Sequence, residues 1–353
     1  MMIQKNNFDA IVIGAGPAGS TAAYLLAKSG FHVLVLDKKE FPRSKLCGGL
    51  LTRKTIGLLE KIFQTSPDCL ISNQIISHQS SRYGVNLRDK ALVRGKLEYP
   101  FHFVDRQVYD SFWLNMACNA GAEFRSGDKV IALDPSKNRV ITGTGHRYSG
   151  TYIFGADGAP SRLRRWLAAE GLIKNQNKMG LATALELVVS RDQAPALPDY
   201  PVIYFGNIRW GYAWCFPGKQ YRVIGICGLN AKAGRFLRKA YEAFLDSIHI
   251  PRERIPAPAS HALPYGNYLK TPGYGNVLLL GDACGLADPL LGEGIYYAHK
   301  SAQLAAEAVI QFYHEPPAAL KWYARYLNRV IISELKYVCI GRQIIFSLPG
   351  AWP

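Results

Sequence analysis

The sequence predicts an α/β protein in which an antiparallel sheet interrupts a parallel one, and three observations support this fold class. Near the N-terminus, residues 8–13 form an apolar run, residues 17–29 have a helical pattern, and residues 31–36 form a second buried run. Between residues 181 and 229, short β-rich runs alternate with glycine and proline turns. A buried strand returns at residues 276–280, and helices follow it. The antiparallel sheet is therefore expected to be inserted into a split nucleotide-binding domain.

A glycine-rich turn, GAGPAG at residues 14–19, joins the first strand to the first helix. In this GxGxxG arrangement Gly14 permits the tight turn, Gly16 lets the backbone approach a pyrophosphate, and Gly19 lets the helix pack on the strand. The free N–H groups of the helix N-terminus then point at the phosphates. Asp37 ends the second strand, where an acid can bind ribose hydroxyls. These features together predict a bound dinucleotide, and the alternative is an ordinary glycine-rich turn.

Two later segments decide between NAD and FAD. Asp157 and Gly158 follow one apolar strand, and Gly281 and Asp282 follow another. An acid at a strand end can bind ribityl hydroxyls or phosphate-linked water. Residues 292–295 (GEGI) open a helix, where backbone N–H groups can reach a flavin ring and stabilise its reduced anion. The three segments in this order predict FAD.

These segments resemble the FAD-binding signatures of the para-hydroxybenzoate-hydroxylase-like flavoproteins, over about residues 8–310. The resemblance implies a glutathione-reductase-like FAD-binding domain, a parallel sheet built on a βαβ unit, with an inserted antiparallel-sheet substrate domain and C-terminal helices. It also implies a cofactor contact for Arg106, at the start of a helix expected over residues 105–120. The alternative for Arg106 is a solvated surface side chain.

Further segments are similar to those of the geranylgeranyl reductase family. They are residues 45–50 (KLCGGL), residues 211–217 (GYAWCFP), which match the family's YxWxFP element, and the GEGI segment. Hydroxylases of the superfamily usually carry a histidine where this chain has Cys284. The chain departs from the family in its shorter length and in Arg209, where the longer motif often has proline. The predicted cofactor contacts are Gly14, Gly16, Ala18, Gly19, Asp37, Lys38, Cys47, Gly48, Arg106, Asp157, Gly158, Gly281, Asp282, Pro289, Gly292, Glu293, Gly294 and Ile295.

Three aromatic residues, Tyr212, Trp214 and Phe216, alternate along one expected strand and therefore project to one face. They can wall an apolar cavity for a long substrate tail, whose burial is driven by apolar area. The alternative from the pattern alone is that they form sheet core; the resemblance favours a substrate-binding wall. It also places Cys47, beside two glycines, at the active site, with a buried, inert cysteine as the alternative.

The resemblance implies reduction of carbon–carbon double bonds in a polyprenyl or other isoprenoid lipid. Reduced flavin would give a hydride from N5 to one alkene carbon, and an acid would protonate the other. Cys47, Tyr212 and Trp214 are the candidate catalytic residues, with Cys47, Tyr212 or a held water as the proton donor. The electron donor is expected to be NAD(P)H or ferredoxin. The sequence contains no second GxGxxG segment for NADPH, but relatives on this fold often lack one, so the sequence does not choose between the two donors.

Two other functions remain open from the sequence. One is an FAD-dependent monooxygenase or halogenase on the same fold; halogenases carry a GWxWxIP element close to the segment at residues 211–217. The other is a non-catalytic flavin- or lipid-binding regulatory protein.

The chain is basic, with 42 lysine and arginine residues against 26 aspartate and glutamate residues and a formal net charge of +16. An anionic partner suits this excess, although a solubilising surface is the alternative. No nucleic-acid-binding motif is present, so nucleic acid is not an expected partner. Lys321, Arg325, Arg329 and Lys336 fall in one helical sector and are candidate contacts with an anionic membrane. A solvated helix face is the alternative.

The seven cysteines are odd in number and form no CxxC pair, which favours a reducing compartment. The histidines show no metal-binding spacing, so no metal is expected. No signal peptide and no spanning helix are predicted; residues 337–352 come closest, but Arg342 divides them. We therefore expect a cytoplasmic protein, with the inner face of the membrane as its candidate contact.

The domain borders follow from these segments. The FAD-binding domain is expected at residues 1–75, 101–170 and 271–312, and the substrate domain at residues 76–100 and 171–270. Residues 313–353 form the expected C-terminal helical segment. Within the domains, residues 129–133 and 139–142 are expected to form a hairpin, residues 202–205 and 212–216 strands, residues 232–248 a helix, and the segment from there to Pro264 a proline-rich connector.

Overall fold

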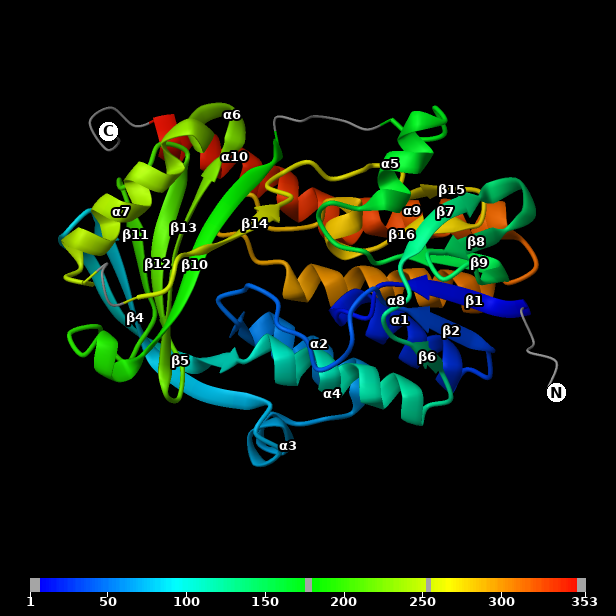
Figure 1. Cartoon of the computed structure of the whole chain (residues 1–353), viewed down its shortest axis with the longest axis horizontal. Helices are drawn as coiled ribbons and strands as arrows, with labels where there is room; N and C mark the ends of the chain where they lie inside the picture. Colours follow the sequence, from blue (N-terminus) through cyan, green and yellow to red (C-terminus); the bar gives the residue numbers. More distant parts are fainter. Residues whose placement is uncertain (1–6, 175–179, 252–254, 348–353) are drawn as a thin grey trace.

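Two eight-stranded sheets lie at opposite ends of the molecule, with helices packed on the first and beside the second (Figure 1). The computed structural model describes residues 7–174, 180–251 and 255–347. The parts of the expected domains at residues 1–6, 175–179, 252–254 and 348–353 lie outside the described residues.

The first sheet has the strand order β15-β16-β9-β1-β2-β6, and β16, β9, β1, β2 and β6 run parallel. The expected hairpin, β7–β8, joins it through antiparallel pairing of β8 with β9. Parallel strands buried on both faces are built from continuous apolar runs, as in the four buried residues of β2. The strands are β1 (Asn7–Ile13), β2 (Val33–Leu36), β6 (Glu123–Arg125), β7 (Val130–Asp134), β8 (Arg139–Thr142), β9 (Arg147–Gly155), β15 (Gly273–Tyr274) and β16 (Val277–Leu279).

Helices α1 (Pro17–Lys28), α4 (Arg106–Asn119) and α8 (Ile295–Gln311) pack together beside this sheet (Figure 1). The buried imidazole of His299 on α8 joins them, because Nδ1 lies 2.6 Å from the Thr21 hydroxyl of α1 and Nε2 lies 2.8 Å from the Tyr109 hydroxyl of α4. The expected helix after Asp105 is confirmed, with the Asp105 side chain accepting the N–H of Gln107 at its start. The smaller helices of this part are α2 (Arg53–Phe63), α3 (Pro67–Ser72) and α5 (Arg162–Ala169).

The second sheet has the order β14-β10-β13-β12-β11-β4-β5-β3, in which only β11 and β4 pair in parallel. Alternation along its strands divides the side chains between two faces. Leu185 and Cys215 join a buried cluster with α7 (Leu237–Ser247), whereas Ala184 and Trp214 belong to a cluster on the other face. The strands are β3 (Leu50–Leu51), β4 (Ile76–Leu87), β5 (Lys90–Val104), β10 (Ala182–Ser190), β11 (Val202–Phe205), β12 (Gly211–Pro217), β13 (Tyr221–Leu229) and β14 (Ala259–Leu263).

Three segments differ from the expectation. The single helix expected at residues 232–248 is divided into α6 (Asn230–Ala233), a 3₁₀ turn at Gly234–Phe236 and α7 (Leu237–Ser247). The expected proline-rich connector contains β14, which pairs with β10. The C-terminal helices are α9 (Pro316–Leu327) and α10 (Ser333–Ser347), joined by a π-helical turn at Asn328–Ile332. Among the described residues, no helix is long and apolar enough to cross a bilayer.

Candidate functional site

A cavity of about 1000 Å³ lies between the two sheets, lined by the loops of the first and the inner face of the second. Its size suits a small-molecule or cofactor site. Most of the predicted cofactor contacts and all three aromatic residues line it. Gly19, Gly281 and Pro289 are the exceptions.

The glycine-rich turn at residues 14–19 has no room for a side chain at Gly14 or Gly19. Gly14 has a φ of +105°, and a Cβ there would lie 2.3 Å from the carbonyl oxygen of Ala156. A Cβ on Gly19 would lie 1.8 Å from the carbonyl oxygen of Gly14. Helix α1 begins directly after Gly16 with no side-chain cap, so its first N–H groups are free for a phosphate. This backbone cradle fits the pyrophosphate of the predicted FAD.

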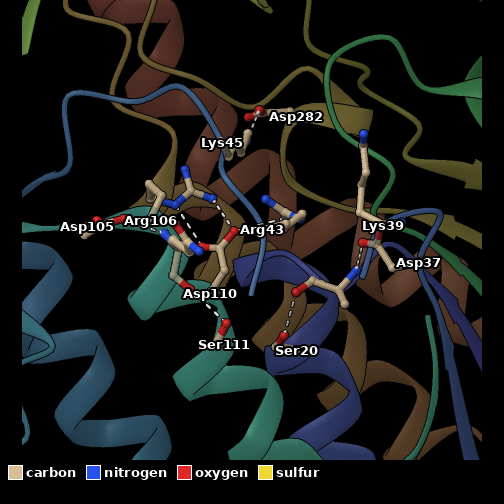
Figure 2. Close-up of polar contacts among 12 residues, drawn as sticks. Ser20, Asp37, Lys39, Arg43, Lys45, Asp105, Arg106, Asp110, Ser111 and Asp282 are labelled. Atoms are coloured by element: carbon tan, nitrogen blue, oxygen red, sulfur yellow. Dashed lines mark hydrogen bonds and ion pairs between the residues drawn. The ribbon is translucent and has the colours of Figure 1, made fainter. Parts of the chain in front are cut away.

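Asp37 at the end of β2 holds this turn in place (Figure 2). One carboxylate oxygen accepts the N–H of Ala15 at 2.8 Å, and the other accepts the N–H of Lys39 at 2.9 Å. Each carboxylate oxygen has a second lone pair, so Asp37 can still accept a hydroxyl hydrogen from a ribose. Lys38, which follows it, is exposed at the cavity edge.

Asp157 at the end of β9 has one carboxylate oxygen with no hydrogen-bond partner, although that oxygen is buried. The other oxygen accepts the N–H of Arg162 at 2.6 Å. Burial raises the pKa of this carboxyl. A buried unpaired oxygen is costly, and a hydroxyl or ordered water of a bound dinucleotide would satisfy it. The side chains present therefore fit FAD.

A buried charge cluster lies beside the cavity (Figure 2). Arg106 of α4 donates two hydrogen bonds to Asp110, at 2.8 and 2.9 Å, and Arg43 lies 3.0 Å from the same carboxylate. Nearby, the Lys45 ammonium lies 3.7 Å from Asp282. Arg106 is therefore not a solvated surface side chain, and its orientation at the cavity is set by Asp110.

The segment at residues 292–295 reaches the cavity from the start of α8. Helix α8 has no side-chain cap at Gly294, so its first N–H groups are available. Gly292 has a φ of +70°, and a Cβ there would lie 3.2 Å from the hydroxyl of Tyr212. Glu293 accepts the hydroxyls of Thr52 at 3.0 Å and Thr55 at 3.1 Å, which connects this segment to α2. The close approach of Gly292 to Tyr212 joins the cofactor loops to the second sheet.

The aromatic side chains of β12 form one continuous wall of the cavity. The ring centroids of Tyr212 and Trp214 are 5.5 Å apart, and those of Trp214 and Phe216 are 6.3 Å apart. Gly48 packs against this wall, since a Cβ there would lie 2.6 Å from the Phe216 ring. A Cβ on Gly225 of β13 would lie 2.1 Å from the Trp214 ring. The KLCGGL segment and the aromatic wall are therefore in contact.

The cavity residues that the sequence reasoning missed include Glu186 on β10 and His261 on β14. Glu186 is 4% exposed, and one of its carboxyl oxygens accepts the N–H of Cys47 at 2.8 Å. Burial raises the pKa of Glu186 to about 7. Burial and the charge of Lys45 lower the pKa of His261 to about 4. An acid in an apolar strand was the available signal for Glu186, but it is equally typical of a solvent-facing position.

Known proteins resemble the chain in sequence over most of its length. Residues 12–53 match the family model of an NAD(P)-binding Rossmann-like domain. An uncharacterized protein of Methanosarcina barkeri is 33% identical, with 99% of this chain and 86% of that protein covered. The geranylgeranyl diphosphate reductase of Rhodobacter capsulatus is 31% identical, with 89% and 78% covered.

Solved structures share the fold. A geranylgeranyl bacteriochlorophyll reductase-like protein of Thermoplasma acidophilum superimposes with a TM-score of 0.85 at 20% identity, covering 97% of this chain and 88% of that one. The halogenase PltM in complex with FAD superimposes with a TM-score of 0.72 at 21% identity, covering 96% and 75%.

Fold, cavity and similarities define the protein as an FAD-dependent oxidoreductase. Within that class, the chain belongs to the geranylgeranyl reductase family.

Proposed function

We propose that this enzyme saturates carbon–carbon double bonds in a polyprenyl or other isoprenoid lipid. The observation that carries the proposal is the wall formed by Tyr212, Trp214 and Phe216, which lines the same cavity as the cofactor loops. An isoprenoid tail is apolar and long, so its binding is driven by buried area against such a wall. Relatives include the geranylgeranyl diphosphate reductase noted above and a digeranylgeranylglycerophospholipid reductase of Methanosarcina mazei.

When bound and reduced, FAD supplies a hydride. The roles that we propose for the chain are to bind and orient the two reactants. The cradle at Gly14 and Gly16 would hold the pyrophosphate, and Asp157 would accept a hydrogen bond from the cofactor. The Gly292–Ile295 backbone would hold the flavin ring. The aromatic wall holds the alkene beside it and excludes water, with Cys47 in the neighbouring loop. We propose NAD(P)H or ferredoxin as the source of electrons.

The test is anaerobic reduction of the purified holoprotein, followed by a panel of polyprenyl diphosphates, archaeol-type lipids and quinones. We expect a mass gain of two units for each bond saturated. Phe216→Ala is a sensitive variant because it opens the wall, and Phe236→Ala is its matched control, since Phe236 is exposed outside the cavity. Oxygen uptake coupled to substrate would support the monooxygenase or halogenase alternative instead. A bound flavin that neither dithionite, NAD(P)H nor ferredoxin reduces would support the non-catalytic binder.

We also propose that the C-terminal helices contact an anionic lipid bilayer. Lys321 and Arg325 lie on α9, Arg329 lies in the π-helical turn, Lys336 lies on α10, and all four are exposed. Their spacing of four or seven residues favours one side of this helical segment.

The same side continues as an apolar stripe at Ile340 and Ile344, which follow Lys336 at intervals of four residues and are 55% and 62% exposed. Cations beside exposed apolar side chains complement the headgroups and acyl boundary of an anionic membrane.

Helix α10 contacts segments next to the cavity, which favours lipid entry from the membrane. Arg342 on α10 donates to the carbonyl oxygens of Tyr265 and Pro289, at 2.8 and 3.2 Å. Leu291, two residues beyond Pro289, lines the cavity and is half exposed. A lipid that leaves the bilayer near α10 would therefore reach the cavity edge at Leu291.

Vesicle flotation tests this contact. Replacing the four cations with serine should weaken binding to phosphatidylglycerol vesicles by about 10-fold or more, since each surface cation contributes about 1 kcal/mol. The double variant Ile340→Ser/Ile344→Ser should weaken it as well, whereas Phe236→Ser should not. Equal binding of the wild type to neutral phosphatidylcholine vesicles, or no loss in either variant, would contradict the membrane contact.

A further inference from the structure

Glu186 is a buried acid in the cavity wall. It lies on the inner face of β10 with Ala184, while its neighbours Leu185 and Leu187 pack toward α7 on the opposite face. Its side chain is therefore directed to the side of the sheet that carries the aromatic wall.

The Glu186 carboxyl has no ion-pair partner. Among the described residues, no lysine, arginine or histidine nitrogen lies within 4.0 Å of it. Its one hydrogen bond to the KLCGGL loop comes from a backbone N–H, that of Cys47. A carboxylate without a counter-ion is expensive to bury, so the neutral acid is favoured. Burial raises the pKa of Glu186 to about 7, and the Cys47 N–H, the charge of Arg106 and the neighbouring Trp214 indole oppose that rise.

The other polar groups on the cavity face of the second sheet are poorer acids. The carboxyls of Asp157, Asp288 and Glu293 line the cavity from the loops of the first sheet, where they accept hydrogen bonds from neighbouring N–H or hydroxyl groups. The Tyr212 hydroxyl already donates its hydrogen to the carbonyl of Leu291, and burial raises its pKa well above the usual range. The Trp214 indole has no acidic proton near neutral pH. His261 is neutral, because burial and Lys45 lower its pKa to about 4. A neutral carboxylic acid is the stronger proton donor by several orders of magnitude.

We propose that the Glu186 carboxyl is the catalytic proton donor to the alkene, an inference that rests on the proposed lipid reduction. One carboxyl oxygen is fixed by the Cys47 N–H, and the other carries the proton toward the cavity. The O–H bond of Glu186 breaks as a C–H bond forms at one alkene carbon, while the hydride from reduced FAD forms a C–H bond at the other. The π bond is lost, FAD is left oxidised by two electrons, and Glu186 is left as a carboxylate that water reprotonates.

The groups around Glu186 define its titration. Cys47 and Arg106 both lower the pKa of Glu186, the first through its backbone N–H and the second through its charge. Tyr241 of α7 lies on the other side of the sheet. Burial raises the pKa of Tyr241, so it is uncharged near neutral pH. Arg106 keeps its charge and is paired with Asp110. Reoxidation of the reduced flavin by lipid should therefore slow as the pH rises through about 7, because the Glu186 carboxylate has no proton to donate.

Glu186→Gln tests the proposal, with Glu98→Gln as the matched control, since Glu98 is exposed on β5 of the same sheet. Both variants should retain FAD and be reduced by dithionite as the wild type is. Reoxidation by the lipid should slow by about 100-fold or more in Glu186→Gln only, the range typical of a lost general acid.

A second readout does not depend on turnover. At pH 6 the infrared difference spectrum of the wild type minus Glu186→Gln should contain the band of a protonated carboxyl, and the difference spectrum of the wild type minus Glu98→Gln should not. In Cys47→Ala the backbone N–H remains, so the band should remain and reoxidation should slow less than in Glu186→Gln.

Reoxidation of Glu186→Gln within about 3-fold of the wild type would overturn the donor role while leaving the proposed function intact. A wild type that saturates no polyprenyl lipid would overturn the proposed function, and the donor role with it. If Glu186→Gln does not fold, the wild type alone decides: a reoxidation rate that is constant as the pH rises through 7, or no carboxyl band, overturns the proposal.

Discussion

The two sheets contribute to one cavity in different ways. The first sheet presents mainly backbone: its loops at Gly14, Gly158 and Gly292 have positive φ, and a side chain at Gly14 would collide with the main chain. The second sheet presents side chains, with Glu186 and Trp214 on its inner face. The cofactor side of the cavity is therefore defined by where side chains are missing, and the opposite side by which side chains are present.

This difference predicts how each sheet responds to substitution. A backbone cradle tolerates no added Cβ but little depends on the chemistry of its side chains. A side-chain wall tolerates changes of shape at the cost of substrate affinity rather than cofactor retention. Substitutions in the first sheet should therefore affect FAD, and those in the second should affect the lipid.

The largest effect is expected at the first glycine. Gly14→Ala should weaken FAD binding by about 100-fold or more, because it adds backbone strain of about 1–3 kcal/mol and a contact of 2.3 Å with Ala156. Flavin absorbance of the purified protein and titration of the apoprotein measure it. Gly30→Ala is the control, since its φ is also positive, +87°, but nothing lies within 4 Å of the added Cβ. Normal FAD affinity in Gly14→Ala would contradict the claim that the first sheet binds the cofactor through a backbone with no room for side chains.

The charge cluster should have the next largest effect, on stability. Asp110→Asn leaves the buried guanidinium of Arg106 and that of Arg43 without a counter-ion, which should cost about 3–5 kcal/mol in urea unfolding. Asp89→Asn, at an exposed turn, should cost less than about 0.5 kcal/mol.

The same cluster predicts a pH dependence. Burial opposes ionisation of Asp110, but Arg106 and Arg43 outweigh it and hold the pKa of Asp110 below its usual range. The stabilisation is therefore present above about pH 4, the pKa of an unfolded aspartate, and is lost as the pH falls through the lower folded value. Unfolding midpoints that do not depend on pH in this range, or an unaffected Asp110→Asn, would contradict a stabilising role.

The smallest effect is expected for a substitution on the second sheet, where the affinity for the lipid should change and FAD binding should not. Trp214→Ala should raise the KM for the lipid by about 10- to 100-fold, with FAD content unchanged, because it removes apolar contact area from the wall. Cys215→Ala is the control on the same strand, since Cys215 packs toward α7. It should lower stability and leave KM as it is; the reverse pattern would show that the two faces are assigned wrongly.

The sequence by itself predicted the cofactor loops, because the constraint on a glycine is local and can be read from its neighbours. The strands at residues 202–205 and 211–217 and their one-sided aromatics were predicted for the same reason, since period-two alternation is a local property. The prediction of one helix at residues 232–248 was wrong in part, because the segment is divided. The prediction of a connector before Pro264 was wrong in part as well, because β14 forms there through its pairing with β10.

Only the tertiary structure decided what the polar residues do. Glu186 alternates with Leu185 and Leu187, a pattern that fits a solvent-facing acid as well as a cavity acid. Whether Glu186 is a cavity acid depends on whether its face of the second sheet is covered. That face is covered by loops more than 100 residues away in the chain, such as the loop that holds Cys47. The pairing of Arg43, Arg106 and Asp110 likewise joins a loop to a helix. Burial and charge pairing arise from packing between distant segments, and for that reason the chemistry of the site was fixed only when the two sheets enclosed it.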